Sequence, residues 1–107
     1  MEIGQLAHQG DVIIQRIEQL PTTAKKQEIE KSIVLAYGEV TGHCHQIATP
    51  KEVNVYIEGA RQFLEVCYVQ GATITHEEHA PITLDPGIYE ISIQAEYFPQ
   101  AVRSVLD

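Results

Sequence analysis

Two short histidine motifs contain the residues of this sequence whose types and spacing could do chemistry. The first, GHCH, covers residues 42–45, and the second, HEEH, covers residues 76–79. Neutral imidazoles together with carboxylates bind divalent transition metals such as zinc, nickel, iron and manganese. We therefore predict a metal or ligand site formed by His43, His45, His76 and His79.

The first motif can place two histidines on one side of a strand. If residues 39–45 are extended, the period-two geometry puts Glu39, His43 and His45 on one face, with the backbones of the two histidines about 7 Å apart. Imidazoles at that spacing can converge on one ion. Cys44 then points the other way, which predicts that its side chain packs in the core.

The second motif leaves the ligand set open. A turn brings the rings of His76 and His79 to one side, whereas a straight strand separates them. Three histidines favour a zinc site, and two histidines with Glu39, Glu77 or Glu78 resemble the facial triad of non-haem iron sites. In a third interpretation both motifs are solvated and bind no ligand.

Short β-strands must position these motifs. Extended runs recur between turn residues, and they predict an all-β fold, a small barrel or sandwich of about seven to eight short strands with a short C-terminal helix over residues 98–106. The length fits a single β domain spanning residues 1–107. The predicted strands lie near 12–17, 33–37, 44–48, 53–57, 62–69, 72–75 and 88–97.

Several local predictions accompany this fold. Residues 21–31 are polar and read as an exposed connector. The turn Asp85-Pro86-Gly87 leads into a strand whose alternation predicts that Tyr89, Ile91 and Ile93 point inward. Cys67, between Val66 and Tyr68, is expected to be buried.

Charge and composition exclude several classes of function. The chain has 15 acidic and 7 basic residues, a net charge of −8, and no run of Lys or Arg forms a compensating basic stripe, so we expect no nucleic acid and no anionic membrane as partner. The acidic start is not typical of a signal peptide, and two cysteines fit a reducing compartment, so a cytoplasmic location is expected. The sequence contains no Gly-rich nucleotide-binding loop and no GxSxG motif, which leaves no nucleotide cofactor to predict.

Four blocks of the sequence resemble those of a family of small, uncharacterised bacterial proteins. They are GDVIIQRIEQLP, GEVTGHCHQI, THEEHAPITLDPGIYEI and AEYFPQAVRSVLD, and together they span most of the chain. The resemblance implies that both histidine motifs belong to the design of that family. It implies no particular reaction.

The first histidine motif also resembles the first motif of the cupins, which are β-barrels with a histidine-lined mouth. Gly38, His43 and His45 match the glycine and the HxH of that motif. Residues 48–50 are Ala-Thr-Pro where a cupin has its glutamate, and the HEEH motif precedes the Pro-Gly turn instead of following it. The resemblance is therefore an analogy of architecture.

Three functions from different classes fit the sequence. The first is a β protein whose metal is structural or regulatory, in a homo-oligomer whose subunits share the histidines. The second is a small metalloenzyme, hydrolytic or oxygen-using, with an open metal position. The third is a module without metal that pairs its exposed strands with a protein partner. The first is favoured because so small a chain spends most of its residues on its own core.

Overall fold

The computed structural model describes residues 1–29, 33–37, 44–47 and 53–94, and these residues form ten β-strands and no helix. The all-β class predicted from the sequence is therefore confirmed for the described part of the chain. The strands are β1 (Leu6–Gln9), β2 (Val12–Ile17), β3 (Lys25–Gln27), β4 (Ile33–Tyr37), β5 (Cys44–Ile47), β6 (Val53–Glu58), β7 (Arg61–Val66), β8 (Ala72–Ile74), β9 (Ile82–Leu84) and β10 (Gly87–Ile93).

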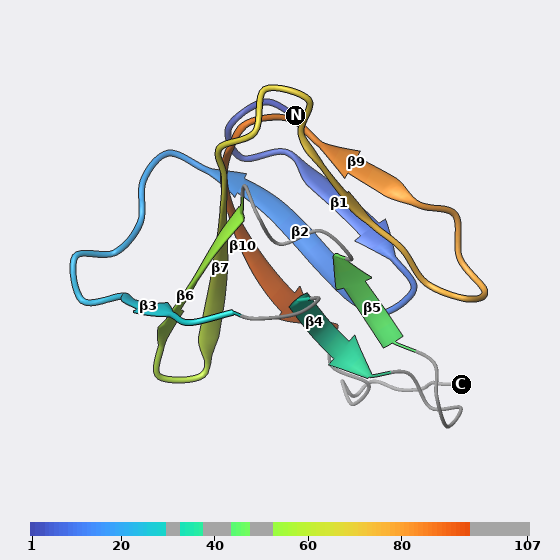
Figure 1. The fold of residues 1–107 in the computed structure, drawn as a ribbon, viewed down its shortest axis with the longest axis horizontal. Coiled ribbons are helices and arrows are strands. Elements are labelled where there is room, and N and C mark those ends of the chain that lie inside the picture. Colours follow the sequence, from blue (N-terminus) through green and yellow to red (C-terminus); the bar gives the residue numbers. More distant parts are fainter. Residues whose placement is uncertain (30–32, 38–43, 48–52, 95–107) are drawn as a thin grey trace.

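Six of these strands form one antiparallel sheet in the order β1-β2-β10-β7-β6-β3 (Figure 1). The hairpins β1–β2 and β6–β7 join neighbours in sequence, and β10 inserts between them as the partner of both β2 and β7. Strand β3 at one edge is only three residues long and begins with two lysines. Short, charged edge strands are the usual protection against pairing with another chain.

Two further hairpins, β4–β5 and β8–β9, lie outside this sheet. They are joined to each other by a pair of backbone hydrogen bonds. The Gln46 N–H donates to the Thr75 carbonyl at 3.0 Å, and the Thr75 N–H donates to the Gln46 carbonyl at 2.9 Å. Residue 46 thus lies opposite residue 75, and antiparallel geometry then places residue 45 opposite residue 76. This register decides the geometry of the histidine cluster described below.

The core lies between the large sheet and the two hairpins. Alternation along β2 buries Val12 and Ile14 and leaves Ile13 and Gln15 partly exposed, as a half-buried strand requires. The same core cluster takes residues from both layers: Val12, Ile14, Val53, Val55, Leu64, Val66, Tyr89 and Ile91 from the sheet, and Ile33, Leu35, Ile47, Ala72, Ile74 and Leu84 from the hairpins.

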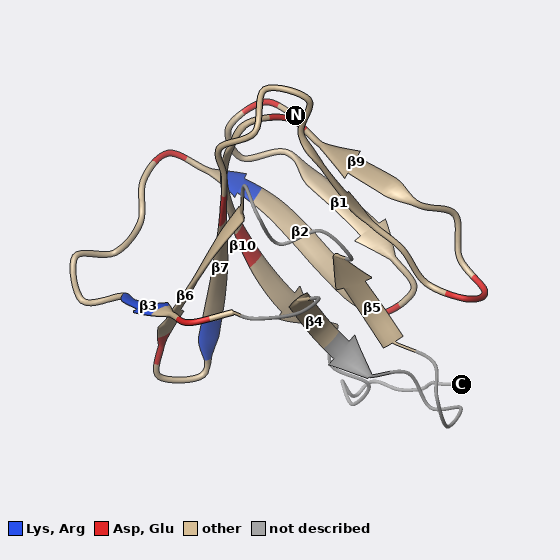
Figure 2. Ribbon diagram, in the orientation of Figure 1, with Lys and Arg blue, Asp and Glu red and all other residues tan. Residues whose placement is uncertain are grey.

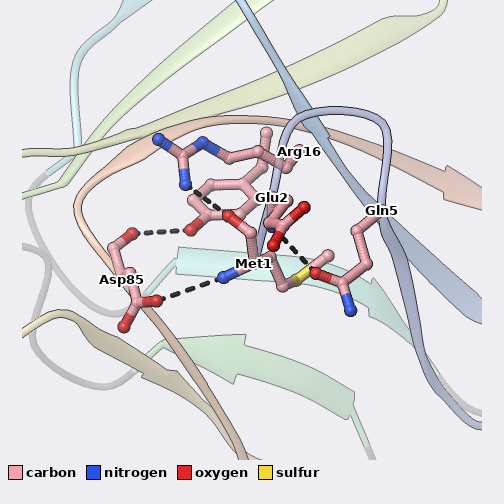
Figure 3. A network of polar contacts seen from close by, with 6 residues as sticks. Met1, Glu2, Gln5, Arg16 and Asp85 are labelled. Carbon is pink, nitrogen blue, oxygen red and sulfur yellow. Dashed lines mark hydrogen bonds and ion pairs between the residues drawn. The ribbon is translucent and has the colours of Figure 1, made fainter.

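A polar network fixes one end of the sheet (Figure 3). The Met1 ammonium forms an ion pair with Asp85 Oδ2 at 3.1 Å, and Arg16 Nη1 donates to the Met1 carbonyl at 2.6 Å. Tyr89, which is fully buried, donates its hydroxyl to the Asp85 carbonyl at 2.7 Å. These contacts hold the first residues against the turn before β10.

Three strands were not predicted, and two local predictions were wrong. Strands β1, β3 and β9 add to the seven predicted runs, and β3 lies within the supposed connector 21–31. Tyr89 and Ile91 point inward as predicted, but Ile93 is 49% exposed because β7 pairs with β10 only as far as Ile91. Cys67 is exposed, since it follows the last residue of β7. The helix predicted over 98–106 lies outside the described residues.

Basic residues are scattered over the described part of the chain. Figure 2 shows them on β3, at the end of β2 and at the start of β7, on three separate strands. None of the described residues belongs to a helix that is long and apolar enough to cross a membrane. The absence of nucleic acid and membrane partners stays a prediction.

Candidate functional site

His45 occupies a core position of β5. The strand alternates, with Cys44 and Gln46 half-buried and His45 and Ile47 buried, and only 1% of His45 is exposed. The prediction that Cys44 takes the core face was therefore wrong, because it is the histidine that points inward. A buried imidazole requires hydrogen-bonding partners, and the surrounding segments supply them.

The HEEH motif follows β8 and lies directly against His45. The ring centroids of His45 and His76 are 4.3 Å apart, those of His76 and His79 are 4.6 Å apart, and those of His45 and His79 are 6.0 Å apart. The antiparallel register that pairs Gln46 with Thr75 accounts for the first distance. We call these three residues the histidine cluster. His43 and Glu39, also predicted for the site, lie outside the described residues.

The turn of residues 76–79 is held by one hydrogen bond within the turn and by one from β5. Glu77 Oε1 accepts the Cys44 backbone N–H at 3.0 Å, and His76 Nδ1 accepts the Glu78 backbone N–H at 3.0 Å. His76 is half-buried and His79 is exposed. The motif thus forms a turn, the geometry that brings both rings to one side.

The β1–β2 turn, formed by Gly10 and Asp11, lies against the cluster on another side. Gly10 has φ +61°, while Asp11 has a negative φ, the combination found in type II′ hairpin turns. A Cβ atom on Gly10 would lie 2.7 Å from His79 Nε2 and 3.3 Å from His45 Cε1. The glycine therefore serves both the turn and the close approach of two imidazoles.

Two polar residues of this turn contact the two nitrogens of His45. The Nδ1 atom lies 2.8 Å from Gln9 Oε1, and the Nε2 atom lies 3.6 Å from Asp11 Oδ1. Gln9 is buried, with 2% exposed, whereas the Asp11 side chain is 45% exposed. The backbone of Asp11 is also fixed, since its carbonyl accepts the Gln94 N–H at 2.7 Å.

Burial and the neighbouring His76 lower the pKa of His45 below its ordinary value. His79 acts in the same direction, while the carboxylates of Asp11 and Glu77 raise that pKa and only partly compensate. Close imidazoles disfavour charge on one another. His45 is therefore neutral at physiological pH, and neutral imidazole is the form that binds metals.

As they stand, the donors of the described ranges do not converge. No group of three or more His, Cys, Asp or Glu side chains is arranged there to hold a metal ion, because the three rings of the cluster pack side by side. A cavity of about 400 Å³ between β4 and the strands β7 and β10 has no histidine among the described residues that line it.

Sequence reasoning missed three residues of the site, which are Gln9, Gly10 and Asp11. The Gly10-Asp11 pair directly precedes the strand predicted near 12–17, and glycine before a run of alternating apolar residues also signals a hairpin turn. Nothing in the sequence marks Gln9, which lies 36 residues from the histidine that it contacts.

Fold and site together define an antiparallel all-β domain with a cluster of three histidines, one of them buried, at the contact of its two layers. The chain belongs to the family described as "Domain of unknown function (DUF8820)", whose model matches residues 8–94. The match covers both histidine motifs, and it ends where the block AEYFPQAVRSVLD begins. No curated protein and no solved structure matches the chain significantly.

Proposed function

We propose that this chain binds one divalent transition metal ion at the histidine cluster, with zinc as the best fit, and that the ion has a structural or regulatory role. The observation that carries the proposal is the 3.6 Å separation between His45 Nε2 and Asp11 Oδ1. In a tetrahedral zinc site with bonds of about 2.0–2.2 Å, neighbouring ligand atoms lie about 3.4 Å apart. The two atoms therefore already have the spacing of two ligands of one ion.

His79 supports the proposal as the third ligand. Its Nε2 atom lies against Gly10, the residue next to Asp11, and the side chain is exposed. An exposed imidazole can change its rotamer at a cost of about 1 kcal/mol or less, which is small beside the free energy of zinc binding. A rotation of this ring toward Asp11 is the rearrangement that the proposal requires.

His76 is less suited to the first coordination sphere in this arrangement. Its Nδ1 atom accepts the Glu78 N–H, so a neutral His76 carries its proton on Nε2. Ligation through either nitrogen would require a change in that bond. His43, outside the described residues, stays a predicted fourth ligand.

A structural or regulatory role is supported by the three separate segments of the chain that the ion would connect. His45 belongs to β5, Asp11 to the β1–β2 turn and His79 to the segment between β8 and β9. An ion held by all three would link the large sheet to both hairpins, and binding restricted to the folded state stabilises it. A metalloenzyme stays the alternative, and a labile water ligand at the ion would favour it.

The test is metal content followed by titration. The protein, purified without chelator or added metal, is analysed for zinc, nickel, iron and manganese, and the metal-free form is then titrated with zinc by calorimetry. We expect one ion per chain. Asp11→Asn and His79→Ala should each weaken zinc binding by at least about tenfold, since each removes one ligand.

His8→Ala is the matched control, because His8 is an exposed histidine of β1 that has no contact with the cluster in the described structure. It should bind zinc as the unsubstituted protein does. If none of the four metals binds, or if zinc binding is insensitive to both Asp11→Asn and His79→Ala, the proposal is wrong and the interaction module becomes the better interpretation. Self-association and cytoplasmic location stay predictions.

A further inference from the structure

The buried side chain of Gln9 makes three hydrogen bonds at the centre of the site. Its Nε2 atom donates to the carbonyls of Ile74 and Ala80, at 2.9 Å each. Its Oε1 atom lies 2.8 Å from His45 Nδ1. One amide group therefore touches the end of β8, the segment before β9 and the buried histidine of β5.

The two carbonyls determine which way this amide faces. A backbone carbonyl only accepts hydrogen bonds, so the group between Ile74 O and Ala80 O must be the amide NH₂, which has two N–H donors. The flipped amide would place an oxygen against two oxygens in a buried site, where unpaired polar groups are costly. The Gln9 oxygen must therefore face His45.

An amide oxygen facing Nδ1 in turn determines the tautomer of His45. The oxygen can only accept, so Nδ1 must carry the proton, and in a neutral imidazole the other nitrogen is then an acceptor. The Nε2 lone pair thus lies on the side of Asp11, 3.6 Å from Oδ1. Two electron-rich atoms face each other across a gap that suits a cation.

We infer that Gln9 is a positioning residue that holds neutral His45 in the Nδ1–H tautomer and so keeps Nε2 available as a metal donor. Asp11 alone would favour the opposite tautomer, because its carboxylate can accept a hydrogen bond from Nε2–H. Histidines that bind metals generally donate their other ring N–H to a fixed acceptor, and Gln9 would supply that acceptor here. The functional meaning of the inference rests on the proposed metal site, whereas the tautomer itself does not.

The tautomer can be measured in the metal-free protein. Two-bond ¹H–¹⁵N correlation spectra, recorded at about pH 8.5 where histidines are neutral, distinguish a protonated ring nitrogen from one with a lone pair. We expect His45 to show Nδ1–H and a bare Nε2. A spectrum with Nε2–H as the main form would overturn the inference, whatever the metal data show.

Gln9→Met tests whether Gln9 is the cause. The thioether has nearly the shape of the amide but no N–H donor and only a weak acceptor, so the tautomer should change to Nε2–H, directed at Asp11. Gln15→Met is the control, because Gln15 lies in the neighbouring strand and makes one long hydrogen bond, to Gly4 O at 3.4 Å. It should keep the original tautomer. If Gln9→Met also keeps Nδ1–H, the assigned role of Gln9 is wrong.

Zinc affinity separates this inference from the proposed function. Gln9→Met should weaken zinc binding by about 10- to 100-fold, the usual effect of removing an outer-shell partner, and Gln15→Met should leave it unchanged. If the unsubstituted protein has the Nδ1–H tautomer but binds no metal, the proposed function fails and the assignment of the tautomer to Gln9 stands. The spectrum of the unsubstituted protein decides the tautomer even if Gln9→Met does not fold.

Discussion

Gly10→Ala adds a methyl group where the histidine cluster packs against the β1–β2 turn. The new Cβ would lie 2.7 Å from His79 Nε2 and 3.0 Å from His79 Cδ2, closer than such atoms pack, and 3.3 Å from His45 Cε1. His79 is exposed and can move away, whereas His45 is buried and tied to Gln9. The substitution should therefore displace His79 and press on His45.

The expected loss of stability comes mainly from the backbone. Gly10 has φ +61°, and an alanine in that left-handed region costs about 1–2 kcal/mol. The smaller conformational entropy of alanine in the unfolded chain offsets about 0.4–1 kcal/mol of this. The net loss should be about 1 kcal/mol, or roughly 4–8 °C in Tm for a domain of this size.

Gly59→Ala is a matched control for the backbone term. Gly59 has φ +59° and begins the two-residue turn between β6 and β7, and a Cβ there would have no atom within 4 Å. Urea denaturation should therefore give similar losses for both variants. Zinc titration should separate them, with affinity reduced by at least about tenfold for Gly10→Ala alone.

Two results would refute this reasoning. Unchanged zinc affinity in a folded Gly10→Ala variant would mean that the position of His79 against the turn does not matter for the ion. A loss of stability several kcal/mol larger than that of Gly59→Ala would mean that the clash with the cluster, and not the turn, dominates.

Three further predictions concern stability. In the metal-free protein, the free energy of unfolding should fall as the pH drops below about 6.5. The reason is that His45 gains a proton there in the unfolded chain but not in the folded protein, where its pKa is lowered. Urea denaturation between about pH 5 and 8 should show this loss of stability, and the loss should be smaller in His45→Gln. Tyr89→Phe removes the hydroxyl that donates to Asp85 O at 2.7 Å and should cost about 1 kcal/mol in thermal denaturation. Arg61→Ala breaks an exposed ion pair with Glu90 and should leave the midpoint of urea denaturation nearly unchanged, with any change smaller in high salt.

The fold class was predictable because several of the longer strands alternate between buried and more exposed residues. Val12 and Ile14 on β2, and Tyr89 and Ile91 on β10, show the period of two that marks one buried face. Strand β3 has no such signal, since its residues Lys25–Gln27 are all polar and it is a strand through its pairing with β6. Short strands of this kind depend on their tertiary partner, which no local pattern reveals.

The candidate site was predictable only in part. The motif HEEH left open whether His76 and His79 share one side of a turn or are separated on a strand, and periodicity alone could not say which face of β5 is buried. That choice depends on the pairing of Gln46 with Thr75 and on Gln9, whose amide satisfies the buried His45. Both are contacts between segments that lie far apart in the sequence, and no local sequence pattern predicts either of them.

The three hydrogen bonds of Gln9 also bear on when this part of the molecule can form. The bonded carbonyls lie 65 and 71 residues further along the chain. Contacts of such long range are slow to form, because closing the long loops between them costs conformational entropy. During synthesis the amide of Gln9 lacks at least one of these two carbonyl partners until Ala80 has left the ribosome. The three bonds therefore report that β5, β8 and the segment before β9 have all packed against the β1–β2 hairpin.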